Sequence, residues 1–290
     1  MLPHREKERQ IRRKPLRRRI GASMATIGTW LVILIFAAPI IWTLLLSFRS
    51  EADAASRSLE LFAPFTFDNY FKVFGTTAGR SAWGPLSNSI IASFGSTLLA
   101  IVIAIPAAYA LSLEAVRKSN DVLFFLLSTK FLPVVAALLP QYLFAVAIRA
   151  VDSRLWLVLL YIIFNLPIAI WLLASFMSDI PKEVQEAASL DGASRFRIIG
   201  QIVIPVIKPG LVATALICVI LSWTELLIAR TMTGSEALTA PVFLTGFVTT
   251  QGQFLAQLSA ASIIVSLPIL FFGLGAQRQL VRGLSLGAIK

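Results

Sequence analysis

Long uncharged apolar segments constrain this 290-residue chain more than any other feature. The segment Ile20–Phe48 contains no charged residue and is longer than the ~20 residues that cross the hydrocarbon core of a bilayer. It also exceeds the apolar region of about 7–15 residues in a cleaved signal peptide, so we expect a retained signal anchor. Hydrophobic residues make up 57% of the chain, and the mean hydropathy is +0.80. A soluble domain is less apolar than this, so the sequence predicts a polytopic membrane protein.

Six transmembrane helices account for the apolar segments and for the polar sequences between them. Span three contains Lys130, Pro133 and Pro140, which predicts a broken helix that faces other protein or water. The charge-free stretch Ala237–Gln277 has room for two spans, but a seventh span would place the basic C-terminal tail outside. We therefore expect an all-α fold with six spans. These are Ile20–Phe48, a segment within Ser81–Leu113, Val122 to about Ile148, Leu155–Ser178, about Pro209–Arg230 and about Phe254–Gly275.

The basic residues are unevenly distributed about these spans. Nine of the 26 Lys and Arg residues precede Ile20, and with six spans eighteen lie in cytoplasmic segments against seven in outer loops. The positive-inside rule then places both termini and the polar segment 181–208 in the cytoplasm. We predict a basic cytoplasmic tail at residues 1–19, a six-span domain at 20–278 and a cytoplasmic C-terminal tail at 279–290. The basic tail is expected to anchor at membrane lipid rather than to bind nucleic acid.

The polar segment from residue 181 to residue 208 predicts a helical hairpin. Pro181 and Glu183 suit the first turn of a helix. Gly192 suits the positive φ that commonly follows a helix C-terminus, so we place the turn there. Ser194 can then cap a second short helix. Three apolar residues would share one face of that second helix, namely Phe196, Ile199 and Val203.

The residues leave the role of this hairpin open. Ala187, Ala188 and Ser189 would form a shallow surface onto which another protein could pack, but a solvated loop between two spans explains the composition equally well. The spacing of Ala188, Gly192 and Ile198 also matches a DNA-binding helix-turn-helix. About thirty residues held between two spans cannot form that three-helix domain, so DNA binding is disfavoured.

Motifs for catalysis and for nucleotide binding are absent from the sequence. It contains no GxxxxGK[ST] phosphate-binding loop, no HExxH and no GxSxG. The single Cys218 permits no intrachain disulfide, and the lone His4 in the charged tail does not make a metal site. We therefore expect no enzyme activity, no metal and no cofactor in this chain. Any energy source would be a separate protein.

One extended pattern resembles a known family. Glu186-Ala187-Ala188, three residues, Gly192, nine residues and Ile202-Val203-Ile204-Pro205 resemble the EAA loop of ATP-binding-cassette (ABC) importer permeases. That family has Leu where this chain has Ile204. Shorter motifs resemble the carbohydrate branch, the maltose-permease type, although Thr224 stands where that branch commonly has Asn. They are Thr66 with Asn69-Tyr70, Asn88-Ser89, Ala107 to Leu111, Asn165-Leu166-Pro167, Trp223 with Glu225, and Arg282-Gly283-Leu284.

The resemblance implies a six-span permease subunit in a bacterial-type inner membrane. Its implied partners are a second similar permease, two ABC ATPase subunits that bind ATP and Mg, and an extracytoplasmic solute-binding protein. Seven hairpin residues would contact the ATPase: Glu186, Ala187, Ala188, Asp191, Gly192, Ile202 and Pro205. The alternatives are a secondary transporter or channel, which would work without the ATPase, and a non-transporting membrane scaffold.

Two charged residues within the spans are candidates for the translocation path. A charge at the bilayer centre costs about 2.5–3.5 kcal/mol on insertion scales, so Lys130 and Glu225 should face an aqueous path or the bundle interior. They could equally snorkel from a helix end or pair with each other as a structural lock. Tyr142, Asn165 and Trp223 could contact a polyhydroxylated solute, although packing between helices explains them equally well.

The solute class follows mainly from the resemblance. Neutral polar and aromatic side chains outnumber ions in spans three to six, which slightly favours a sugar or sugar alcohol over an ion. Three further motifs look like those of permeases for polyols and related sugars: Thr129 to Pro133, Leu258 to Ser262, and Leu280 to Lys290.

Overall fold

The computed structural model of the chain describes residues 16–56, 64–75, 81–114, 116–249 and 252–287. Nearly all of the described chain is helical, as the sequence predicts. The strands of the described residues form an antiparallel ladder of two residues each, β1 (Val248–Thr249) and β2 (Gly252–Gln253), and turns and loops join the helices. Most of the predicted basic tail, residues 1–15, lies outside the described residues, and so do the last three residues of the C-terminal tail.

The helices follow the predicted order of spans, with short helices between them. The first half of the chain contains α1 (Leu16–Ser47), α2 (Glu51–Ala55), α3 (Asp68–Phe74), α4 (Trp83–Leu113), α5 (Ser119–Ser128), the 3₁₀-helix η1 (Thr129–Phe131), α6 (Val134–Ala147) and α7 (Arg154–Met177). The second half contains α8 (Lys182–Leu190), α9 (Arg195–Ile198), the π-helix η2 (Ile199–Val203), α10 (Ile204–Val206), α11 (Lys208–Trp223), α12 (Leu227–Met232), α13 (Ala240–Thr245) and α14 (Leu255–Gly287).

Within the described residues, four helical segments are long and apolar enough to cross a membrane. They are Thr26–Ser47, Trp83–Leu113, Arg154–Met177 and Leu255–Gln277. Two further candidates are bent pairs, Ser119–Phe131 with Val134–Ala147 at 84° and Arg195–Val206 with Lys208–Trp223 at 83°. The number of spans reaches six if each bent pair is one span.

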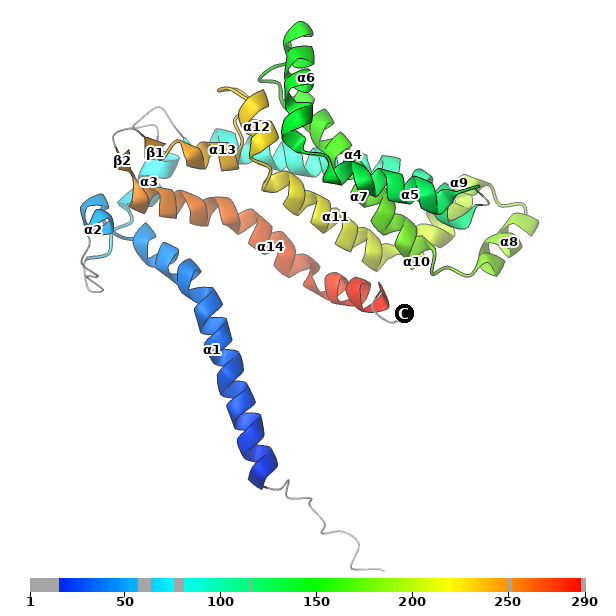
Figure 1. The fold of residues 1–290 in the computed structure, drawn as a ribbon, viewed down its shortest axis with the longest axis horizontal. Helices are drawn as coiled ribbons and strands as arrows, with labels where there is room; N and C mark the ends of the chain where they lie inside the picture. Colours follow the sequence, from blue (N-terminus) through cyan, green and yellow to red (C-terminus); the bar gives the residue numbers. More distant parts are fainter. Residues whose placement is uncertain (1–15, 57–63, 76–80, 115, 250–251, 288–290) are drawn as a thin grey trace, which may run out of the picture.

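Two predicted spans differ from continuous helices. The break expected near Lys130 is present, because the chain turns at Leu132 and Pro133 and α6 leads away from α5 to pack beside α12 (Figure 1). Span five, predicted from about Pro209 to Arg230, is not one continuous helix. The residues between Trp223 and Leu227 separate α11 from α12.

Four helices form the body of the molecule. The helices α4 and α7 pack against each other, α11 packs on both of them, and α14 lies along α11 (Figure 1). Ala100, Ala104 and Ala108 of α4 are fully buried. Such small side chains let helix backbones approach closely, which is how helices commonly pack where lipid removes the hydrophobic driving force.

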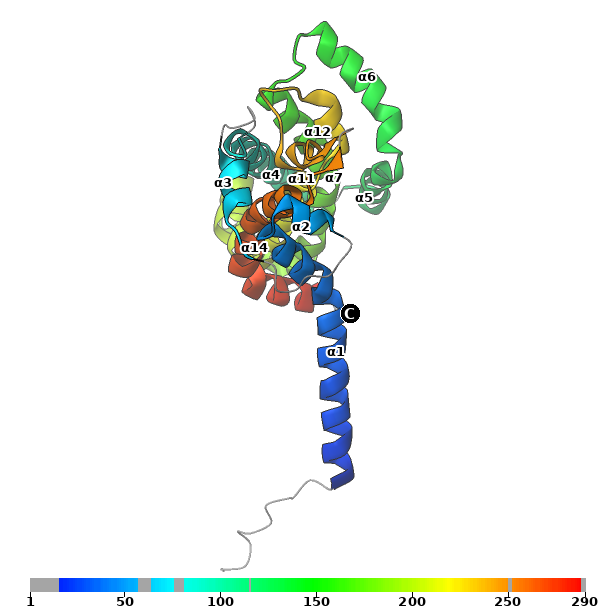
Figure 2. The same ribbon diagram turned by 90° about the vertical axis from the view of Figure 1, so that its left-hand side faces the viewer.

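The first helix leaves this body. Only the C-terminal end of α1 contacts α14, and the rest of α1 projects away in both views (Figures 1 and 2). No residue in its apolar window is buried, and Phe36 is 76% exposed. Its end is fixed by Asn69, whose Nδ2 donates to the carbonyls of Ser47 and Arg49 at 2.9 and 2.7 Å. The apolar surface of α1 therefore suits lipid or an apolar partner helix.

Candidate functional site

The hairpin of residues 181–208 lies at one end of the body, beyond the C-terminal end of α7 (Figure 1). Its first helix, α8, ends in a Schellman motif, because the N–H of Gly192 donates to the Ser189 carbonyl at 3.1 Å and the N–H of Ala193 donates to the Ala188 carbonyl at 3.0 Å. Gly192 has φ +76°, which confirms the predicted turn at this residue.

The second arm of the hairpin begins as the sequence predicts but presents a different face. Ser194 caps α9, since its Oγ accepts from the N–H of Arg197 at 3.4 Å. The predicted shared face is wrong, because Phe196 is 87% exposed whereas Ile198 and Val203 are buried. The π-helical turn η2 widens the helix after Ile198, so the spacing of an ordinary α-helix does not identify the buried residues.

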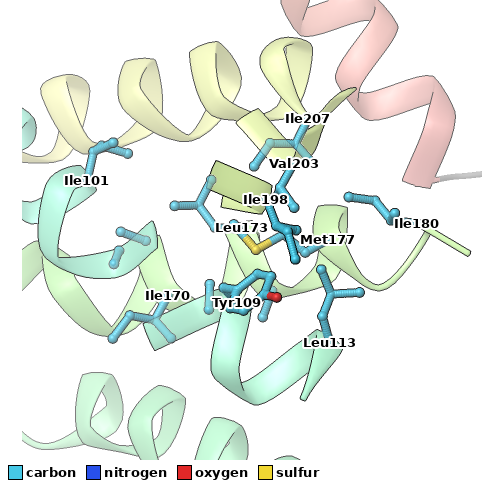
Figure 3. Packing of buried hydrophobic residues seen from close by; sticks show 14 of the residues in the cluster. Ile101, Tyr109, Leu113, Ile170, Leu173, Met177, Ile180, Ile198, Val203 and Ile207 are labelled. Atoms are coloured by element: carbon cyan, nitrogen blue, oxygen red, sulfur yellow. The ribbon is translucent and has the colours of Figure 1, made fainter. Parts of the chain in front are cut away.

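The buried residues of the second arm attach the hairpin to the body. Figure 3 shows Ile198, Val203 and Ile207 packed among side chains from the ends of α4 and α7. Those side chains are Tyr109, Leu113, Leu173 and Met177. In contrast, α8 contains no buried residue, and of its two motif alanines only Ala188 is half-buried, against this cluster. The second arm is therefore the anchored half of the hairpin.

The structure brings the seven predicted ATPase-contact residues onto this one hairpin. Glu186, Ala187, Asp191, Gly192 and Pro205 are exposed, whereas Ala188 and Ile202 are half-buried. Two large apolar residues near the turn are also exposed, although the sequence did not assign either of them to a partner surface. Leu190 is 89% exposed and Phe196 is 87% exposed. Apolar side chains in a polar loop were the available signal, because such residues are costly to expose unless a partner covers them.

Lys130 lies at the 84° bend between α5 and α6. Its ammonium donates to the backbone carbonyl of Phe164 on α7 at 2.6 Å and lies over the Phe164 ring, 3.1 Å from the ring centroid. A hollow of about 190 Å³ opens at this bend. The polar residues that line it are Thr129, Lys130 and Gln141, and the ring of Phe164 lies beside them.

Glu225 lies in the break between α11 and α12. Its Oε1 accepts from the N–H groups of Leu227 and Ile228, both at 2.9 Å, and so caps the start of α12. Tyr161 on α7 donates its hydroxyl to the Glu225 carbonyl at 3.3 Å. Lys130 and Glu225 thus contact α7 one helical turn apart, at Phe164 and Tyr161. Within the described residues no ion pair joins them.

The other three candidates for the path lie in different surroundings. Asn165 is fully buried and donates to Ser222 Oγ at 2.6 Å, which joins α7 to α11. Trp223 is buried and donates from Nε1 to the Val265 carbonyl of α14 at 3.2 Å. Both side chains therefore hold helices together in this chain. Tyr142 lies on α6 and is 39% exposed.

A carboxylate at the other end of α7 holds two loops together. Asp152 precedes α7, and its Oδ1 accepts from the N–H groups of Gly234 and Ala237 at 2.7 and 2.8 Å, while Oδ2 accepts from that of Glu236 at 3.0 Å. Burial raises the pKa of Asp152, but these backbone hydrogen bonds outweigh that effect and hold the pKa below its ordinary value. Nothing in the sequence near Asp152 indicates these contacts.

Asp152→Asn is expected to lower the melting temperature by about 2–4 °C, the shift that ~1 kcal/mol gives in a chain of this size. Because folding lowers the pKa of the Asp152 carboxyl, its ionised form stabilises the folded state at pH values above the unfolded-state pKa of about 4. This stabilisation is lost as the pH falls through the folded-state pKa. The wild type should therefore lose more stability than the variant between about pH 5 and pH 3. Thermal unfolding of the purified protein across this range measures both effects. Asp68→Asn, which removes an exposed carboxylate, is the control. Equal acid sensitivity of the wild type and Asp152→Asn would contradict the stabilising role of the ionised Asp152 carboxylate.

Comparison with known protein families gives a match over most of the chain. Residues 100–286 match the family model described as "Binding-protein-dependent transport system inner membrane component". The chain is 34% identical to the trehalose transport system permease protein SugB of Mycobacterium tuberculosis, over 93% of this chain and 100% of the relative. It is 31% identical to the trehalose/maltose transport system permease protein MalG of Thermococcus litoralis, over 91% of this chain and 95% of the relative.

Solved structures share the fold. One chain of a bacterial ABC transporter involved in the import of the acidic polysaccharide alginate superposes with a TM-score of 0.73 at 22% identity, over 90% of this chain and 96% of that chain. A chain of a bacterial alginate ABC transporter in complex with an alginate pentasaccharide-bound periplasmic protein superposes with a TM-score of 0.65 at 15% identity, over 91% and 96% of the two chains.

Proposed function

Because this chain belongs to the family of binding-protein-dependent transport system inner membrane components, we propose that it is a permease subunit of an ABC importer and forms part of the path for a sugar. The family match over residues 100–286 carries the proposal, and this region includes the whole hairpin. The names of the two relatives, one for trehalose and one for trehalose and maltose, favour a carbohydrate solute.

The proposed topology has six spans, with both termini and the hairpin in the cytoplasm. In this arrangement α5 to α6 supply the third span and α11 supplies the fifth, whereas Arg195–Val206, the first half of the second bent pair, belongs to the cytoplasmic hairpin. The excess of Lys and Arg in the segments assigned to the cytoplasm supports the orientation. In this orientation, Asp152 and the loop it holds lie on the extracytoplasmic side.

The hairpin would couple this subunit to ATP hydrolysis elsewhere. Leu190 and Phe196 offer exposed apolar side chains for a cytoplasmic partner, and the buried Ile198 transmits any displacement to the ends of α4 and α7. The proposed partners are two ABC ATPase subunits, which bind ATP and Mg, together with a second permease and an extracytoplasmic solute-binding protein.

The hollow beside Lys130 is the proposed solute contact in this chain. Its ammonium and the amide of Gln141 can donate hydrogen bonds to sugar hydroxyls, and the neighbouring Phe164 ring offers an apolar face. A sugar alcohol remains the finer proposal, and it depends on the motifs Thr129 to Pro133, Leu258 to Ser262 and Leu280 to Lys290.

Affinity purification of the chain from native membranes tests the assembly. We expect a P-loop ATPase and a second permease to copurify with it in amounts comparable to its own. A chain that purifies alone and still transports would instead be a secondary transporter or channel. A chain that purifies with other proteins and moves no solute would be a membrane scaffold.

Thermal shifts of the cognate binding protein test the solute class. Polyols, disaccharides, amino acids and phosphate are added separately, and only the true ligand class should raise the melting temperature. A shift with amino acids or phosphate alone would rule out a carbohydrate, and a shift with disaccharides alone would rule out the sugar alcohol.

A further inference from the structure

The hairpin is joined covalently to α7 and α11 but not to α4. Asp179 to Pro181 lead from α7 into α8, and Ile207 lies between α10 and α11. The helix α4 packs against both α7 and α11 but ends beside the hairpin at Leu113. Any force that the hairpin transmits directly to α4 must therefore pass through non-covalent contacts.

The first arm of the hairpin does not pack closely against the end of α4. A hollow of about 340 Å³ separates them. Its polar lining comes from α4 and its C-cap, from α8 and from the start of α9. These residues are Tyr109, Glu114, Lys182, Gln185, Glu186, Ser189 and Arg195. Direct contact between α4 and the hairpin is therefore concentrated on the second arm.

One ion pair crosses the edge of this hollow. Glu114 is the C-cap of α4, and Arg195 is the first residue of α9, directly after the capping Ser194. Arg195 Nε lies 2.9 Å from Glu114 Oε1, and the two side chains are 76% and 23% exposed. Ile198, one helical turn after Arg195, is buried against Tyr109 and Leu113, so the ion pair and the apolar contact fix the start of α9 to the end of α4 (Figure 3).

We propose that Glu114 is a positioning residue for energy coupling. Through Arg195 it holds the hairpin against α4, so that displacement of the hairpin moves α4 together with α7 and α11. This inference rests on the proposed function as an ATP-driven permease. Because both side chains are partly exposed, the pair contributes modestly to stability, and its removal should weaken coupling without preventing assembly.

The test uses the full complex of permeases, ATPase and binding protein in proteoliposomes. Glu114→Gln and Arg195→Gln should each lower the amount of solute moved per ATP hydrolysed by about two- to five-fold, the factor expected for an exposed ion pair. The double variant should be no worse than either single variant, because both remove the same interaction. The exchanged pair Glu114→Arg with Arg195→Glu should restore most of the wild-type coupling ratio, the amount of solute moved per ATP hydrolysed. Salt should lower the wild-type ratio more than that of Glu114→Gln.

Asp121→Asn is the matched control, because it removes an exposed carboxylate from the nearby start of α5 without breaking this pair. An unchanged ratio in Glu114→Gln, additive losses in the double variant, or a wild-type ratio insensitive to salt would overturn the inference and leave the proposed function intact. A wild-type complex that hydrolyses ATP without moving solute would overturn both.

Discussion

Gly192→Val is expected to abolish coupled uptake while leaving the protein in the membrane. Gly192 has φ +76°, a conformation that β-branched residues adopt only at a cost of about 1–3 kcal/mol. Beyond the adjoining residues, a Cβ at this position would meet no atom within 4 Å, so the cost arises from the local backbone conformation. The Schellman motif should then open, and the tip of the hairpin should lose the shape that the ATPase contacts.

Gly192→Asn is the matched control, because Asn tolerates the left-handed region far better than Val. We expect it to keep most of the uptake. Quantitative blotting of membranes, pull-down of the ATPase and solute uptake separate the possible effects. If Gly192→Val transports normally with normal ATPase occupancy, the hairpin is a passive loop and the coupling proposal is wrong.

Gly210→Ala is expected to reduce strongly the amount of folded protein. Gly210 is buried near the start of α11, directly after the 83° bend, and a Cβ there would overlap the ring of Phe176 on α7. Overpacking of this kind typically costs about 1–3 kcal/mol, because neither helix can move without disturbing its other contacts. The variant should show a lower melting temperature and a lower level in the membrane.

A second substitution provides the decisive control for this site. Phe176→Ala removes the Cγ and Cδ atoms that the new methyl group would meet, so the double variant Gly210→Ala with Phe176→Ala should lose less stability than the sum of the two single losses. Gly273→Ala adds a methyl group to a span helix where nothing lies within 4 Å, and it should not lower stability. A Gly210→Ala protein as stable as the wild type would show that α7 and α11 do not approach as described.

Local sequence chemistry predicted several features of the hairpin. Gly192 marks the turn and Ser194 marks the cap, because each is determined by a backbone requirement that few residues satisfy. The prolines near Lys130 likewise predicted the broken helix that is present at Leu132 and Pro133. These signals lie within a few residues of the features they specify.

Features that depend on contacts between distant segments could not be read from the sequence. The loop that Asp152 holds begins more than eighty residues later in the chain, and no local pattern indicates it. The outward position of Phe196 follows from the burial of Ile198 against α4, which is a tertiary preference. The cost of charge in a membrane drew attention to Glu225, but it does not indicate that this carboxylate caps α12.

ATP-driven uptake in proteoliposomes tests the central claim most directly. The chain is reconstituted with its second permease and ATPase, ATP is trapped inside the vesicles, and the solute-loaded binding protein is added outside. We predict that labelled sugar accumulates with ATP and not with ADP, and that accumulation requires the binding protein. Sugar uptake that needs neither ATP nor the ATPase, or the absence of uptake by the complete assembly with its own binding protein, would contradict this account.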